Sequence, residues 1–161
     1  MKYRRLDREE LEGLEQEFVQ FLVANGITGT DWETIKGEQP EKAEKLIGLF
    51  SDIIIEKTLS NIEYLEVKTP QDIKTFKCQT DKIVLNGLKV EGDTSINFTA
   101  IQDPQEMASL LAGSAAKLQL YTAQKSYHPS RNEELFSMLE NGALISRDGK
   151  LFEALEELKG E

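Results

Sequence analysis

The chain has 161 residues, of which 39% are hydrophobic and 30% charged, so it is long enough to bury a core in one domain. Its 29 acidic and 19 basic residues give a formal net charge of −10, which argues against binding to nucleic acid or to an anionic membrane surface. The single cysteine, Cys78, excludes an internal disulfide and a thiolate metal cluster, and no apolar run is long enough to cross a bilayer. Because the N-terminus also lacks the apolar core of a secretory signal, we expect a cytoplasmic protein.

Helices are predicted over residues 1–60. The first covers about residues 8–25, where one stripe carries Leu11, Leu14, Phe18, Phe21 and Leu22. A short helical turn is expected around Trp32, and a second long helix begins at Pro40 and ends near Ser60. Four capping boxes mark helix starts along the whole chain, at Asp7-x-x-Glu10, Thr30-x-x-Glu33, Asp103-x-x-Glu106 and Ser130-x-x-Glu133.

Strands are predicted in the middle of the chain. Alternation of apolar and polar residues indicates strands near residues 62–67 and 75–78. Asn86-Gly87 lies between two apolar pairs and predicts a tight hairpin, which joins antiparallel strands. A further strand at 95–98, a helix over 104–112 and a strand over 117–123 complete this region.

The chain ends in helices. We expect a helix over 131–141, a short apolar segment at 143–145, a turn at Asp148-Gly149 and a helix over 150–159 with one leucine face. No repeat or linker-like composition interrupts the sequence. We therefore predict a single α+β domain over residues 1–161, with an N-terminal helical pair, a central antiparallel β-meander and C-terminal helices.

A segment without acidic residues is the first candidate site. No Asp or Glu occurs between Glu106 and Glu133, although acids outnumber bases in the chain. The segment presents aromatic and cationic side chains that suit an anionic ligand, namely Tyr121, Lys125, Tyr127, His128 and Arg131. A simpler interpretation is a strand, a turn at Pro129 and a helix capped by Ser130, with exposed basic residues beside them.

A carboxylate pair is the second candidate. Asp52 and Glu56 lie four residues apart, so they share one face of the predicted second helix. Glu63 or Glu66 could complete a set of oxygen ligands for a metal. We favour ion pairs with Arg4, Arg5 or Lys57 instead, and we assign no metal site.

Familiar catalytic motifs are absent from the sequence. It contains no phosphate-binding glycine loop, no G-x-S-x-G, no H-E-x-x-H and no dinucleotide fingerprint. We therefore assign no catalytic residue and no cofactor, and whether the chain is an enzyme stays open, with the balance toward a protein without its own chemistry.

Four blocks carry a resemblance to a known family. "MKYRRL", "FSDIIIE", "EYLE" and "YTAQKSYHPSRNEELFSMLENGALIS" are similar to an uncharacterised family from the Bacteroidetes, a domain of unknown function that occupies the whole chain. The resemblance implies a cytoplasmic bacterial protein. It brings no activity, cofactor or catalytic residue.

Two functions from different classes follow as expectations. The first is a small acidic cytoplasmic binding or adaptor protein that contacts a protein partner, because an acidic surface beside an acid-free segment can steer association. The alternative is an enzyme or a small-molecule or anion sensor with a pocket between sheet and helices. The sequence leaves the partner, any ligand and the oligomeric state open.

Overall fold

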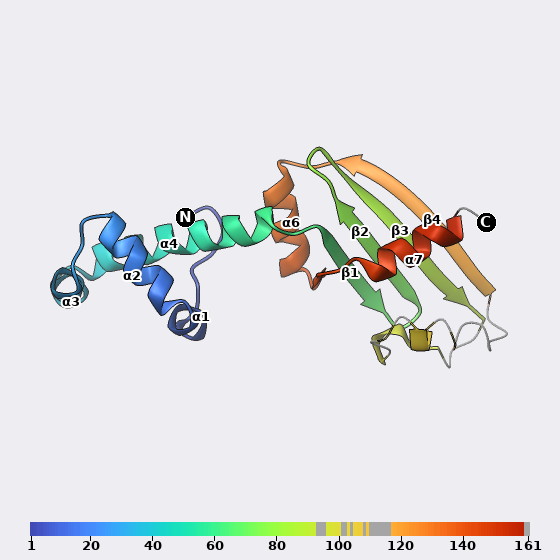
Figure 1. Ribbon diagram of the computed structural model, residues 1–161, viewed down its shortest axis with the longest axis horizontal. Helices are drawn as coiled ribbons and strands as arrows, with labels where there is room; N and C mark the ends of the chain where they lie inside the picture. The colour runs from blue at the N-terminus through green and yellow to red at the C-terminus, as the bar shows by residue number, and fades with distance from the viewer. Residues whose placement is uncertain (93–95, 101–102, 104, 108, 110–116, 160–161) are drawn as a thin grey trace. The chain divides into compact units, whose positions relative to one another are not determined.

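The computed structural model describes residues 1–92, 96–100, 103, 105–107, 109 and 117–159 (Figure 1). The chain divides into two compact units, Met1–Ser60 and Asn61–Glu161. Helices come first, strands lie in the middle and helices end the chain, so the predicted α+β class is confirmed. The single domain over residues 1–161 stays a prediction. In the described part of the chain, no helix is both long and apolar enough to span a membrane.

The N-terminal unit is helical. Its elements are α1 (Arg8–Gly13), α2 (Glu15–Ala24), α3 (Gly29–Glu38) and α4 (Pro40–Ser60). The single helix predicted over residues 8–25 is wrong, because the chain leaves helical geometry at Leu14, directly after Gly13, a residue that weakens helices. The capping box of Asp7 and Glu10 is confirmed. The box predicted at Thr30 is wrong, since Thr28 and Asp31 form it two residues earlier.

Aromatic rings form the centre of the N-terminal unit. The Phe18 ring centroid lies 5.1 Å from that of Trp32 and 5.0 Å from that of Phe50, both in edge-to-face geometry. Phe21 packs against Phe50 at 5.5 Å. Leu6, Leu22 and Ile35 of the same unit are buried as well. The stripe predicted for the first helix thus meets the first half of α4, as an amphipathic helix requires.

The C-terminal unit contains one five-stranded antiparallel sheet (Figure 1). Its strands are β1 (Tyr64–Thr69), β2 (Asp72–Cys78), β3 (Lys82–Glu91), β4 (Lys117–Ser126) and β5 (Leu144–Ser146), in the order β4-β3-β2-β1-β5. Further elements of this unit are η1 (Phe98–Ala100), which lies between β3 and β4 in the sequence, α6 (Arg131–Glu140) and α7 (Lys150–Lys159). In place of the strand predicted at 95–98, the described residues Ile96 and Asn97 precede η1, which begins at Phe98. The helix predicted over 104–112 lies largely outside the described residues.

The hairpin predicted at Asn86-Gly87 is wrong. Strand β3 passes straight through both residues, and each pairs with a residue of β4. The Asn86 side chain is fully buried and donates to a Glu156 carboxylate oxygen of α7 at 2.7 Å. The Tyr121 ring of β4 covers Gly87 and occupies the space that a Cβ would take. These contacts, made by residues distant in the sequence, stabilise Asn86 and Gly87 in extended geometry in place of a turn.

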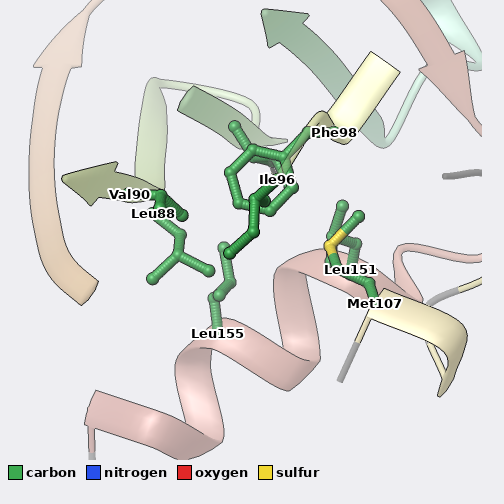
Figure 2. Packing of buried hydrophobic residues seen from close by; sticks show 8 residues of the cluster. Leu88, Val90, Ile96, Phe98, Met107, Leu151 and Leu155 are labelled. Carbon is green, nitrogen blue, oxygen red and sulfur yellow. The ribbon is translucent and has the colours of Figure 1, made fainter. Parts of the chain in front are cut away.

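Helix α7 covers one face of the sheet. Its Leu155 points toward Leu88 of β3, and Leu151, Val90 and Phe98 lie in the same cluster (Figure 2). The remaining members of the cluster are Ile73, Ile96 and Met107. Burial of these side chains contributes roughly 1.5–3 kcal/mol each, so Leu151 and Leu155 of the predicted leucine face fix this helix to the sheet, whereas Leu158 is 50% exposed.

Candidate functional site

The Arg131 guanidinium group is turned toward backbone carbonyls. Nε donates to the Gln79 carbonyl at 3.2 Å, and Nη2 donates to the carbonyls of Ile62 at 2.5 Å and Cys78 at 3.3 Å. Arg131 is the first residue of α6, and its carbonyl partners lie beside the start of β1 and at the end of β2. A planar guanidinium presents several donors in a fixed fork, so one side chain joins three segments.

Tyr127 supports the same junction. Its hydroxyl donates to the Gln79 carbonyl at 2.6 Å. Burial raises the pKa of Tyr127 to about 12, so the hydroxyl stays protonated and keeps donating at neutral pH. The neighbouring thiol of Cys78 is buried as well, and burial raises its pKa to about 11. A thiol with so high a pKa is a poor nucleophile, which agrees with a packing role for Cys78.

Lys125 and His128 meet at Glu134 of α6. The backbone amide of His128 donates to one carboxylate oxygen at 2.7 Å, and Lys125 Nζ lies 2.5 Å from the other. The Glu134 side chain is 10% exposed, whereas that of Lys125 is 64% exposed. The Glu134 carboxylate therefore binds the loop between β4 and α6, and the Lys125 side chain remains accessible from solvent.

Tyr121 belongs to a different group of contacts. Its hydroxyl donates to Asp72 Oδ1 at 2.5 Å, and Lys74 forms an ion pair with the same carboxylate. Burial, followed by the hydrogen bond to Asp72, raises the pKa of Tyr121 well above its usual value. The predicted residues thus fall into two groups, with Lys125, Tyr127, His128 and Arg131 around the β4–α6 loop. Their role in ligand binding stays a prediction.

The Asp52 and Glu56 carboxylates hold the N-terminal segment on α4. Asp52 accepts the backbone amides of Lys2 at 2.6 Å and Tyr3 at 3.0 Å. The Tyr3 hydroxyl donates to Glu56, and Lys2 Nζ lies 3.8 Å from that carboxylate. Among the residues that the structure describes, no three His, Cys, Asp or Glu side chains gather as metal ligands. Backbone amides, which the sequence prediction did not consider, are therefore partners of this pair.

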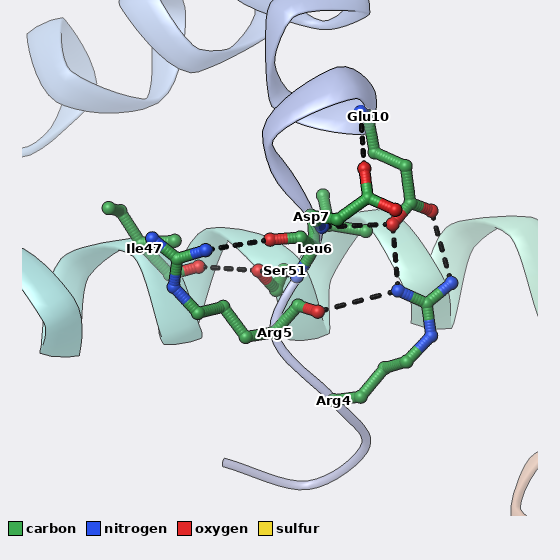
Figure 3. Close-up of polar contacts among 7 residues, drawn as sticks. All are labelled: Arg4, Arg5, Leu6, Asp7, Glu10, Ile47 and Ser51. Atoms are coloured by element: carbon green, nitrogen blue, oxygen red, sulfur yellow. Dashed lines mark hydrogen bonds and ion pairs between the residues drawn. The ribbon is translucent and has the colours of Figure 1, made fainter.

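The next residues of the N-terminal segment are fixed in the same way (Figure 3). The Leu6 amide donates to Ser51 Oγ at 3.0 Å, and Ser51 Oγ donates to the Ile47 carbonyl at 2.7 Å. Arg4 forms two hydrogen bonds with Glu10, at 2.8 and 3.0 Å. The basic cluster at the N-terminus thus neutralises acids of its own unit.

Strand β4 has an open side, which the sequence prediction missed. Among the described residues, β3 is the strand beside β4, and no second strand pairs with its other side. The Gln79 amide donates to Lys82, and the Val90 amide donates to Gln71, so the even-numbered residues of β3 bond to β2. Backbone groups alternate in direction along an antiparallel strand. The odd-numbered residues of β3 therefore bond to β4.

The same alternation identifies the outward-facing backbone groups of β4. Odd residues of β3 pair with odd residues of β4, for example Gly87 with Tyr121. The amides and carbonyls that point away from the sheet are then those of the even positions, Leu118, Leu120, Thr122, Gln124 and Ser126. Most side chains of β4 are exposed. Such an edge can accept another strand, and finding it requires the strand order, which local sequence patterns do not contain.

Among the described residues, α7 covers one face of an antiparallel sheet and β4 forms an edge whose outer side pairs with no strand, so this unit is an α+β domain. The chain belongs to the family of unknown function DUF6495, whose model matches residues 1–160. This confirms the resemblance to a whole-chain domain of unknown function. Comparison with curated proteins and with solved structures found no match.

Proposed function

We propose that this protein is a small acidic adaptor that binds an extended segment of a partner protein along the open edge of β4. The proposal places it in the cytoplasm and gives it no chemistry of its own. In this mode the partner segment becomes a sixth strand, and main-chain hydrogen bonds supply much of the affinity. The observation that carries the proposal is the row of outward backbone groups at the even positions of β4.

The length and exposure of β4 support this role. The strand has ten residues, whereas β5, at the opposite edge of the sheet, has three. Proteins usually shorten or cover their edge strands because a long open edge pairs with other chains. Leu118 of β4 is 46% exposed, so an added strand would also cover apolar surface.

The anion-sensor alternative has less support. It requires cationic donors directed toward a ligand. Arg131 directs donors to the carbonyls of Ile62, Cys78 and Gln79, and the Tyr127 hydroxyl is directed to Gln79. A ligand would have to replace these bonds, each of which satisfies a backbone carbonyl of the unit.

The test compares two substitutions at one exposed position. Gln124→Pro removes an outward amide and leaves the amides that bond to β3, since proline is tolerated on the open side of an edge strand. Gln124→Ala removes the same side chain and keeps the amide. With each protein as bait in native cytosolic extract, we expect a stoichiometric partner to bind wild type and Gln124→Ala and to be lost with Gln124→Pro. A partner that binds all three equally would refute binding at this edge.

A further inference from the structure

The charges along β4 indicate which kind of segment it accepts. The strand contains Lys117 and Lys125 and no acidic residue, in a chain of net charge −10. We infer that the segment bound at this edge is acidic, with carboxylates placed near the two ends of β4. This inference rests on the proposed function and specifies the chemistry of its partner.

The two lysines lie on one face of the sheet. Both occupy odd positions, and side chains alternate between faces along a strand. The even positions of β3, Leu88 and Val90, pack against α7, and in the register Leu88 faces Leu120. Lys117 and Lys125 therefore lie on the face away from α7. The exposed Lys89 of β3, which pairs with Gln119, also lies on that face.

The acids of the same face lie on the inner side of β4. Glu91 of β3 is paired with Lys117 in the register, and Glu134 of α6 contacts Lys125. Asp72 is occupied by Lys74 and Tyr121. A strand added to the open edge would lie on the outer side, next to the two lysines. A carboxylate opposite either lysine would form a favourable cross-strand pair, whereas a lysine there would be repelled.

The same lysines argue against a second copy as the occupant. A symmetric antiparallel pair of β4 strands, centred on Tyr121, would place Lys117 of one copy opposite Lys125 of the other. Each face of the joined sheet is continuous, so both of these pairs would bring like charges directly together. Lysines on an edge strand are a common protection against self-pairing. An acidic segment meets no such repulsion.

The test is a selection of binding peptides from a displayed library of random sequences. The peptides have about the length of β4, because a partner bound at this edge pairs with it as an extended strand. Selection is made on wild type, and each selected peptide is measured again on Gln124→Pro and Gln124→Ala. It is then measured on Lys117→Gln/Lys125→Gln. Lys42→Gln/Lys45→Gln is the matched control, because it changes the net charge equally at exposed residues of α4.

We expect peptides enriched in Asp and Glu that bind wild type, Gln124→Ala and the Lys42/Lys45 control. They should lose binding to Gln124→Pro and weaken about tenfold at low salt with the Lys117/Lys125 variant. Peptides that lose binding to Gln124→Pro but show no acid enrichment would overturn the inference and leave the proposed function standing. If no selected peptide is lost with Gln124→Pro, both fail. A wild-type dimer in light scattering that Gln124→Pro dissociates would identify a second copy as the occupant and also overturn the inference.

Discussion

At the scale of single residues, several charged side chains of this protein bond to backbone groups. Asp52 accepts the amides of Lys2 and Tyr3, Glu134 accepts the amide of His128, and Arg131 donates to three carbonyls. Loss of such a side chain leaves a backbone group without its partner, which costs about 1–3 kcal/mol where the group is buried. The main role of these charged side chains is therefore to join segments of the fold through hydrogen bonds to the backbone.

Arg131→Lys tests this reading. The lysine ammonium group is a compact point charge, so it cannot donate to the carbonyls of Ile62, Cys78 and Gln79 at once as the planar guanidinium does. We expect the free energy of unfolding to fall by about 1–3 kcal/mol, measured by urea denaturation. Arg8→Lys is the control, because the Arg8 side chain is 91% exposed and pairs with Glu12 within one helix, and it should change stability by less than about 0.5 kcal/mol. Equal effects of the two substitutions would contradict the joining role of Arg131.

Glu10 gives the N-terminal unit a dependence on pH. The hydrogen bonds from Arg4, followed by that from the Asp7 amide, lower the pKa of Glu10 from 4.5 to about 2. A lowered pKa means that its contribution to stability is complete above pH 4.5 and is lost as the pH falls toward 2.

Glu10→Gln isolates this contribution. The amide oxygen of glutamine can still accept the Asp7 amide, but the ion pair with Arg4 is lost. We expect wild type to be more stable by up to about 1 kcal/mol at neutral pH, since the pair is partly exposed. This difference should vanish as the pH falls from 4.5 to about 2, in denaturant unfolding followed across that range. A difference that stays constant over the range would show that the ion pair contributes nothing.

At the scale of elements, local signals predict the helices well and the sheet less well. The structure places α4, α6 and α7 within about one residue of their predicted bounds, because Pro40, Ser130 and the Asp148-Gly149 turn mark their starts locally. The path of β3 could not be predicted. Asn86 and Gly87 stay extended because of residues distant in the sequence. Glu156 accepts a hydrogen bond from the Asn86 side chain, and the Tyr121 ring covers Gly87.

Gly87→Ala tests the contact that keeps β3 extended. The new Cβ would clash with the Tyr121 ring, whose hydroxyl is fixed by Asp72. We expect a loss of about 1–3 kcal/mol in the free energy of unfolding. The double variant Gly87→Ala/Tyr121→Ala should lose less than the sum of its single substitutions, because truncating the ring removes the clash. Additive effects would contradict the contact. Gly37→Ala in α3 is the control, as its Cβ would meet open space and should stabilise by roughly 0.5–1 kcal/mol.

At the scale of the whole molecule, the candidate site depends on strand order more than on any motif. The sequence predicts a strand over 117–123 and an acid-free segment around it, but it does not show that this strand is an edge. The edge position follows from the order β4-β3-β2-β1-β5, and the outward groups follow from the register. The acid-free segment has a structural explanation in part, since Tyr127 and Arg131 donate hydrogen bonds to backbone carbonyls. Lys117 and Lys125 remain on the accessible edge.

Amide hydrogen exchange of β4, resolved by residue with NMR, is the most direct test of the central claim. If the edge is open, the amides of Leu118, Leu120, Thr122 and Gln124 should exchange at least about tenfold faster than those of Gln119, Tyr121, Ala123 and Lys125, which bond to β3. The two sets alternate along one strand, so local fraying cannot produce the pattern. Equal protection of both sets would show that the outer side of β4 is already paired and would contradict the proposal that it accepts a partner.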